Sequence, residues 1–165
     1  VDLARYQRAI ARLEHRARTG AAPMYRFRGA RLKAAQDVLQ RRLILRTAQE
    51  GRRLIPCHAG RLNLVLGESG EVYPCETRTT SLGNVRDHDY DLREILRTSA
   101  SRTTLHAIAS GECCCTHECY FITNILFSPR CYPALAREYL RLPGPTAPCV
   151  RGGTARDAPT TRTGS

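Results

Sequence analysis

Two stretches near the start of the chain place apolar residues at helical spacing. The apolar positions of residues 2–18 lie three or four apart: Leu3, Tyr6, Ile10, Leu13 and Ala17. This spacing predicts an amphipathic helix with Asp2 as its N-cap and Gly20 as its stop. Residues 30–50 show the same periodicity and predict a second amphipathic helix. Its expected inward face consists of Leu32, Ala35, Leu39, Leu43 and Ile44.

The periodicity then changes from helical spacing to alternation. Residues 61–66 (RLNLVL) alternate, residues 67–70 (GESG) carry a turn signal, and residues 71–73 (EVY) resume the alternation. This pattern predicts a β-hairpin with a four-residue connection. Cys57 precedes the first strand and Cys75 follows the second. The hairpin would therefore bring two thiols to the same end, although 17 residues separate them.

Short helices are expected to follow the hairpin, at residues 91–97, 101–110, 120–127 and 134–142. Asp89 or Asp91 would cap the first of them, and Gly111 would end the second. A strand is the alternative for 120–127. From residue 143 onward Pro, Gly, Thr and Arg dominate, which predicts a disordered tail. The expected fold class is α+β: a small β-hairpin with a cysteine-rich loop, flanked by helices.

Composition narrows the classes of protein to consider. The chain has 165 residues, of which 42% are hydrophobic and 25% charged, so full disorder is excluded. A catalytic barrel of about 250 residues does not fit, and no apolar run approaches the ~20 residues of a membrane span. The net charge is +11, with 14 basic and four acidic residues in 1–54. Because stacking aromatics are few, we interpret this surplus as solvated helix faces and expect no nucleic-acid partner.

Eight cysteines are the strongest chemical signal: Cys57, Cys75, Cys113, Cys114, Cys115, Cys119, Cys131 and Cys149. Three consecutive cysteines disfavour a disulfide framework. No export signal precedes them, so we expect the reducing cytoplasm, where clustered thiols indicate a metal site. Thiolates favour zinc or an iron–sulfur cluster. The chain lacks the paired Cys-x2-Cys knuckles of a zinc ribbon, which leaves room for a larger cofactor.

Several spaced motifs resemble the SPASM or twitch domain, an auxiliary iron–sulfur module at the C-terminus of many radical S-adenosylmethionine enzymes. The family's Cys, Gly, Cys opening is similar to Cys57, twelve residues, Gly70, four residues and Cys75. Its later elements are similar to the Leu-Gly-Asn of residues 82–84 and to the cysteine cluster of residues 113–119. The resemblance covers about residues 53–133.

The resemblance implies a [4Fe–4S] cluster held by Cys57, Cys75 and Cys119, with Cys115 or Cys113 as the fourth ligand. Cys114 would be a bystander. The family's x2 and x5 cysteine intervals are missing, which favours one cluster over two. For a second cluster, Cys131 would have to act together with thiols of the 113–115 run.

The resemblance also implies a parent enzyme. The Cys-x3-Cys-x2-Cys loop that holds the reductive cluster is absent, so we do not expect this chain to cleave S-adenosylmethionine alone. Residues 1–54 would end an upstream barrel or form a linker, 55–142 would be the cluster domain, and 143–165 the tail. The expected partners are that barrel and its peptide or small-molecule substrate. The module would transfer electrons or anchor the substrate.

Two other interpretations remain open at this point. One is a zinc-stabilised basic binding module without catalysis. The other is a redox thiol protein that uses the consecutive cysteines 113–115. His117 is the one non-thiol candidate ligand, but four thiolates already complete a site. Glu76 and Glu118, which adjoin candidate ligands, are expected to lie around the site or on the surface.

Overall fold

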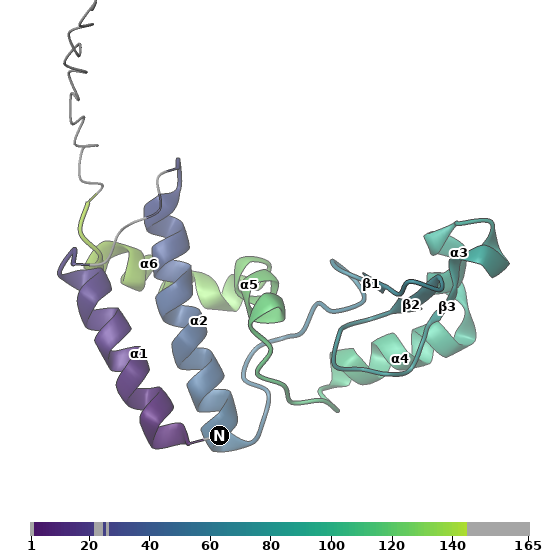
Figure 1. Cartoon of the computed structure of the whole chain (residues 1–165), viewed down its shortest axis with the longest axis horizontal. Coiled ribbons are helices and arrows are strands. Elements are labelled where there is room, and N and C mark those ends of the chain that lie inside the picture. Colours follow the sequence, from purple (N-terminus) through teal and green to yellow (C-terminus); the bar gives the residue numbers. More distant parts are fainter. Residues whose placement is uncertain (1, 22–24, 26, 145–165) are drawn as a thin grey trace, which may run out of the picture.

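The computed structural model describes residues 2–21, 25 and 27–144, and confirms the α+β class. Within these residues six α-helices accompany one three-stranded antiparallel sheet (Figure 1). The helices are α1 (Leu3–Arg18), α2 (Ala30–Glu50), α3 (Leu92–Arg97), α4 (Ser99–Ser110), α5 (Glu118–Leu126) and α6 (Tyr132–Arg141). The strands are β1 (Val65–Leu66), β2 (Glu71–Tyr73) and β3 (Gly83–Asn84). Short 3₁₀ helices span Val85–His88 and Pro129–Cys131. Most of the predicted tail, residues 145–165, lies outside the described residues.

Four helices form what we call the helical layer: α1, α2, α5 and α6. Helix α2 packs against each of the other three (Figure 1). The core of the layer contains Ala35 and Leu39 from α2, Ile125 from α5 and Leu135 from α6. The helices predicted at 2–18 and 30–50 are confirmed to within one residue.

The predicted inward faces of these helices are correct only in part. Ile10 is buried, but Leu13 is 44% exposed because Glu14, one position further, faces α2 instead. On α2, Ala35 is fully buried while Leu32 is 43% exposed. The Asp2 cap is confirmed, since its carboxylate accepts a hydrogen bond of 2.9 Å from the Arg5 N–H.

A half-buried ion-pair network joins three helices of the layer. Arg42 on α2 binds both carboxylate oxygens of Glu14 on α1, at 2.6 Å each. It also donates to Glu138 on α6 at 2.7 Å, and Arg18 approaches the same carboxylate at 3.1 Å. Burial alone would raise the pKa of Glu138, but Arg18 and Arg42 outweigh it and lower that pKa. The carboxylate therefore stays charged inside the layer.

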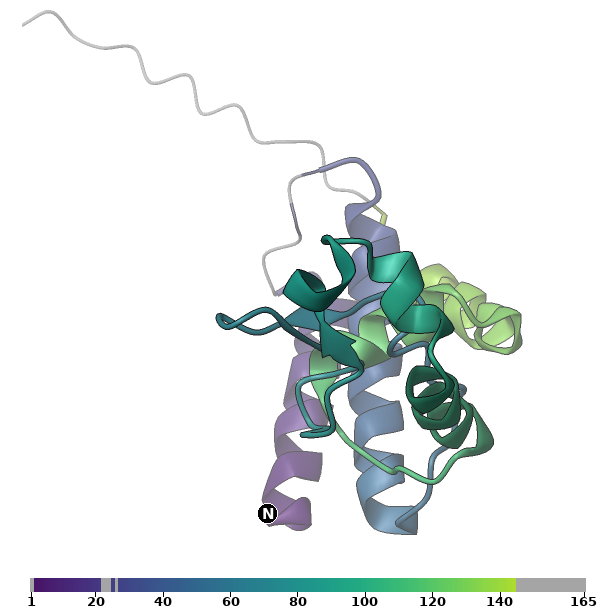
Figure 2. The same cartoon turned by 90° about the vertical axis from the view of Figure 1, so that its right-hand side faces the viewer.

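The remaining elements form the sheet region, which comprises β1–β3, the first 3₁₀ turn, α3 and α4 (Figure 2). Strand β2 pairs antiparallel with β1 on one side and with β3 on the other. The predicted hairpin is confirmed, but its first strand is shorter than expected. Residues 58–63 turn instead, with the Gly60 N–H donating to the Asn63 carbonyl at 2.9 Å. Strand β3, part of the Leu-Gly-Asn element, was not predicted as a strand.

A small apolar cluster of its own stabilises the sheet region. Val72, Leu82, Val85 and Ile95 are buried together there. Asp91 caps α3, as expected, and Gly111 ends α4 in the left-handed conformation. The prediction of a helix rather than a strand at residues 120–127 is also confirmed, as α5 spans Glu118–Leu126.

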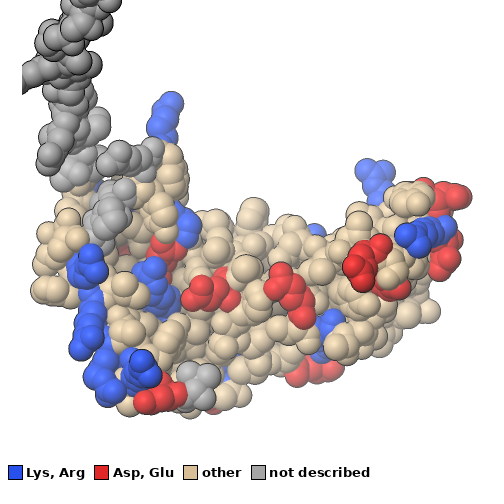
Figure 3. All heavy atoms as spheres, in the orientation of Figure 1, with Lys and Arg blue, Asp and Glu red and all other residues tan. Residues whose placement is uncertain are grey.

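A hydrogen bond joins the segment before β1 to the helical layer: the His58 N–H donates to the side-chain oxygen of Asn124 on α5 at 2.8 Å. Within the layer, Gln40 on α2 donates to the Glu118 carbonyl on α5 at 3.3 Å. Helices α5 and α6 pack on α2 across the predicted boundary at residue 54, and the limits 1–54, 55–142 and 143–165 stay a prediction. Basic side chains gather over α1, whereas the visible face of the sheet region carries both signs (Figure 3). Among the described helices, none is long and apolar enough to cross a membrane.

Candidate metal centre

The candidate ligands come from three separate stretches of the fold. Cys57 precedes the turn that leads into β1, and Cys75 lies two residues after the end of β2. The run 113–115 lies in the loop between α4 and α5, and Cys119 lies in the first turn of α5. The seven cysteines of the described residues are all free thiols.

Cys57 and Cys75 lie beside the same apolar cluster, as the hairpin prediction required. This cluster contains Ala59, Cys75, Ile108 and Tyr120 as buried residues, with Cys57 and Leu105 packed against it. Gly60 permits this close packing. It has a φ of +77°, and an added Cβ would stand 2.2 Å from a methyl carbon of Leu105. A side chain at this position would therefore strain the turn that follows Cys57.

Electrostatics link the thiols of different segments. Burial raises the pKa of the Cys115 thiol, and the His117 backbone N–H opposes this rise. The thiols of Cys57, Cys113 and Cys75 also raise this pKa, so they lie within electrostatic range of Cys115. Thiolates so arranged would repel one another. A bound cationic group would relieve that repulsion, because thiols that coordinate a metal are deprotonated.

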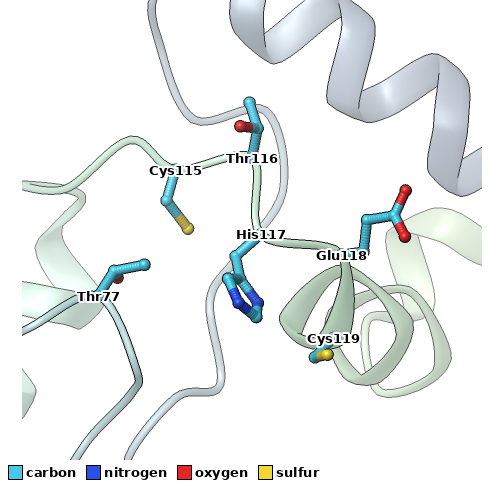
Figure 4. A pocket seen from close by; sticks show the side chains of 6 residues that line it. All are labelled: Thr77, Cys115, Thr116, His117, Glu118 and Cys119. Carbon is cyan, nitrogen blue, oxygen red and sulfur yellow. The ribbon is translucent and has the colours of Figure 1, made fainter.

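A hollow of about 640 Å³ opens beside these thiols (Figure 4). It is lined by Thr77, Cys115, Thr116, His117, Glu118 and Cys119. In Figure 4 the sulfur of Cys115 points into the space between Thr77 and His117, and Cys119 lies on the first turn of α5. Two candidate ligands thus face one hollow, while Cys57 and Cys75 contribute to the apolar cluster beside it.

Polar side chains surround the candidate ligands. The Thr77 hydroxyl lies 3.2 Å from the Cys75 sulfur, and His117 Nε2 lies 2.7 Å from a Glu76 carboxylate oxygen. His117 is therefore engaged by a carboxylate, and Glu76 lies at the site, as expected. Thr77 was not predicted as a site residue. Its position two residues after a cysteine carries no signal without the three-dimensional structure.

Tyr120 is a second residue that the sequence did not single out. Burial raises the pKa of its hydroxyl, the Glu76 N–H acts in the opposite direction, and Cys75 and Cys119 lie close enough to add to the rise. Tyr120 thus neighbours one cysteine from the hairpin and one from α5.

The remaining cysteines lie apart from this arrangement or on its edge. Cys114 is exposed, whereas its neighbours on either side are half-buried. Cys131 is buried in the core of the helical layer, where burial raises the pKa of its thiol. Cys149 falls outside the described residues.

The donor set fits an iron–sulfur cluster in its chemistry, because several soft, partly buried thiols converge from separate segments. Their side chains do not form a closed site for a single ion. Over residues 2–21, 25 and 27–144, no group of three or more His, Cys, Asp or Glu side chains is placed so that it could hold a metal ion. The ligand assignment to Cys57, Cys75, Cys115 and Cys119, with Cys113 as the alternative, stays a prediction.

Comparison with known proteins gives one match. No curated protein and no solved structure matches the chain. Residues 57–120 match the family model of SPASM, described as an iron–sulfur cluster-binding domain. The matched segment begins at Cys57 and ends at Tyr120, so it contains the candidate ligands of a single cluster and excludes Cys131. The resemblance seen in the sequence is thus confirmed over residues 57–120, a segment that matches a family of iron–sulfur cluster-binding domains.

Proposed function

We propose that the chain holds one [4Fe–4S] cluster through Cys57, Cys75, Cys115 and Cys119, as the auxiliary domain of a radical S-adenosylmethionine enzyme. The observation that carries this proposal is the convergence of thiols from the hairpin and from the 113–119 segment, within the stretch that matches SPASM. Cys115 is preferred to Cys113 because it lines the same hollow as Cys119.

A bound cluster would supply one-electron transfer, or an iron site that binds substrate directly. The chain's own residues would control its surroundings. Ala59, Ile108 and Tyr120 exclude water on one side, while the hollow leaves the other side open to a substrate or partner. The Thr77 hydroxyl is placed to donate a hydrogen bond to the Cys75 thiolate, which would raise the cluster's reduction potential.

The parent enzyme's barrel and its peptide or small-molecule substrate are the partners in this proposal. S-adenosylmethionine would bind only to that barrel, because this chain lacks the Cys-x3-Cys-x2-Cys loop. A reducing cytoplasm would keep the cysteines as free thiols that can coordinate iron.

Anaerobic purification with iron and sulfide analysis tests the proposal. A brown protein with about four irons and four sulfides per chain is expected. Cys57→Ser and Cys75→Ser should each lose the cluster, whereas Cys114→Ser, in the same loop as the ligands, should keep it. Cys115→Ser should lose more iron than Cys113→Ser, and the opposite order would make Cys113 the fourth ligand. A colourless protein with one tightly bound zinc would refute the proposal and support a zinc-stabilised module.

A further inference from the structure

We propose that α5 is the element that positions Cys57 and Cys75 for the cluster, through the side chains of Tyr120 and Asn124. The inference rests on the proposed function, since it concerns the same site. It assigns to these two residues a positioning role, in which they act through the backbone next to each cysteine.

Two hydrogen bonds form a matched pair. The backbone N–H of Glu76 donates to the Tyr120 hydroxyl oxygen at 3.2 Å. The backbone N–H of His58 donates to the side-chain oxygen of Asn124 at 2.8 Å. Glu76 directly follows Cys75, and His58 directly follows Cys57. Each expected hairpin ligand is therefore followed by one peptide N–H that is bound by a side chain of α5.

The spacing on α5 explains how one helix reaches both segments. Tyr120 and Asn124 are four residues apart, so they lie on the same helix face, about 6 Å apart along its axis. Each residue is only 4% exposed. Cys119, the expected ligand from α5 itself, directly precedes Tyr120. One helix thus positions three of the four expected ligands: Cys57, Cys75 and Cys119.

The two bonds matter because the cysteines lie in irregular backbone. Neither Cys57 nor Cys75 is part of a helix or strand, so no regular ladder fixes its position. Each bond is only partly buried, so an N–H that loses its acceptor can turn toward water or another partner, and its segment relaxes. Loss of either bond should therefore release one cysteine segment more than the other.

Alkylation of the metal-free full chain, followed by mass spectrometry at each cysteine, tests this selectivity. Tyr120→Phe should increase the alkylation rate of Cys75 several-fold, with a smaller effect on Cys57. Asn124→Leu should do the reverse. Asn124→Asp keeps an acceptor oxygen and should preserve the wild-type rate at Cys57.

Tyr132→Phe is the matched control. The Tyr132 hydroxyl donates to the Leu126 carbonyl at 3.1 Å, so this variant also removes one tyrosine–backbone hydrogen bond from α5, at the end away from Cys119. It should leave both alkylation rates unchanged. If it raises them as much as Tyr120→Phe does, or if each α5 variant exposes both cysteines equally, the positioning role is wrong.

The cluster-loaded protein gives an independent readout. Tyr120→Phe and Asn124→Leu should each release iron to a chelator several-fold faster than wild type, and the double variant faster than either. Equal release rates in all variants would overturn the inference. Cluster binding and the positioning role of α5 can be refuted independently of each other. A wild type that binds no cluster, but shows the crossed alkylation pattern, refutes the proposed function and leaves the positioning by α5 intact.

Discussion

The helical layer and the sheet region reach stability by different means. The helical layer contains the 21-residue α2 and a continuous apolar core drawn from three helices. In the sheet region the strands are two or three residues long, and its apolar cluster has four buried members. Sheets this small are marginal without further support, and small domains commonly gain that support from a metal or a disulfide.

The expected ligands lie where these two regions meet. Cys57 and Cys75 flank the hairpin, while Cys119 belongs to α5 of the helical layer. A cluster bound by all three would act as a cross-link between a region with a continuous apolar core and one with a small core. Cluster binding should therefore stabilise the sheet region, whereas the stability of the helical layer should not depend on it.

Removal of the cluster should give the largest difference between the regions. Loading a site at about a hundred times its dissociation constant slows exchange from the open form about a hundredfold. After chelation, we therefore expect amides of the sheet region, such as those of Leu82 and Val85, to exchange about a hundredfold faster. Amides of α2 such as Leu39 should be unaffected. Hydrogen exchange with mass spectrometry measures both, and equal acceleration in both regions would contradict the cross-link.

One buried isoleucine in each region allows the two apolar cores to be tested separately. Ile125 in the helical layer and Ile95 in the sheet region are both fully buried, and replacing a buried Ile by Ala costs about 2–5 kcal/mol. Ile125→Ala should lower the melting temperature of the whole protein with or without the cluster. Ile95→Ala should mainly open the sheet region, and cluster loading should restore part of the loss. Circular dichroism melts of both forms provide the measurement. Identical cluster dependence in the two variants would mean that the regions unfold as one.

The same contrast explains what the sequence could predict. Long helices with caps such as Asp2 are set by local periodicity, and α1 and α2 begin and end within one residue of expectation. The sheet region depends on distant partners. Strand β3 exists because Gly83 and Asn84 pair with β2, and β1 is short because residues 58–63 turn. Local sequence patterns predict neither the pairing of β3 with β2 nor the turn at residues 58–63.

The candidate site shows the same division. The hairpin rule was sufficient to bring Cys57 and Cys75 to one end, and spaced motifs identified the family. Thr77, Tyr120 and Asn124 were missed because their roles come from contacts across the fold. Leu13 was assigned to the wrong face because an ion pair at Glu14, rather than apolar packing alone, sets the orientation of α1.

The smallest predicted effect concerns the ion pairs of the helical layer. The side chain of Glu138 is 3% exposed, and it binds Arg42 and Arg18. Glu138→Gln would remove the negative charge that pairs with both guanidinium groups. We therefore expect the free energy of unfolding to fall by about 1–2 kcal/mol at neutral pH. The exposed Glu68→Gln at the hairpin turn removes the same charge from the sheet region and should change stability little.

The stability that Glu138 contributes should depend on pH. The pKa of Glu138 is lowered in the folded state because Arg18 and Arg42 together outweigh burial. The stability that the carboxylate contributes is therefore present above its unfolded pKa of about 4.3, and is lost as the pH falls through the lower folded value. The gap in melting temperature between wild type and Glu138→Gln should be widest at neutral pH and should close below about pH 4. A gap that stays constant down to pH 3 would show that packing at this position, and not its charge, stabilises the helical layer.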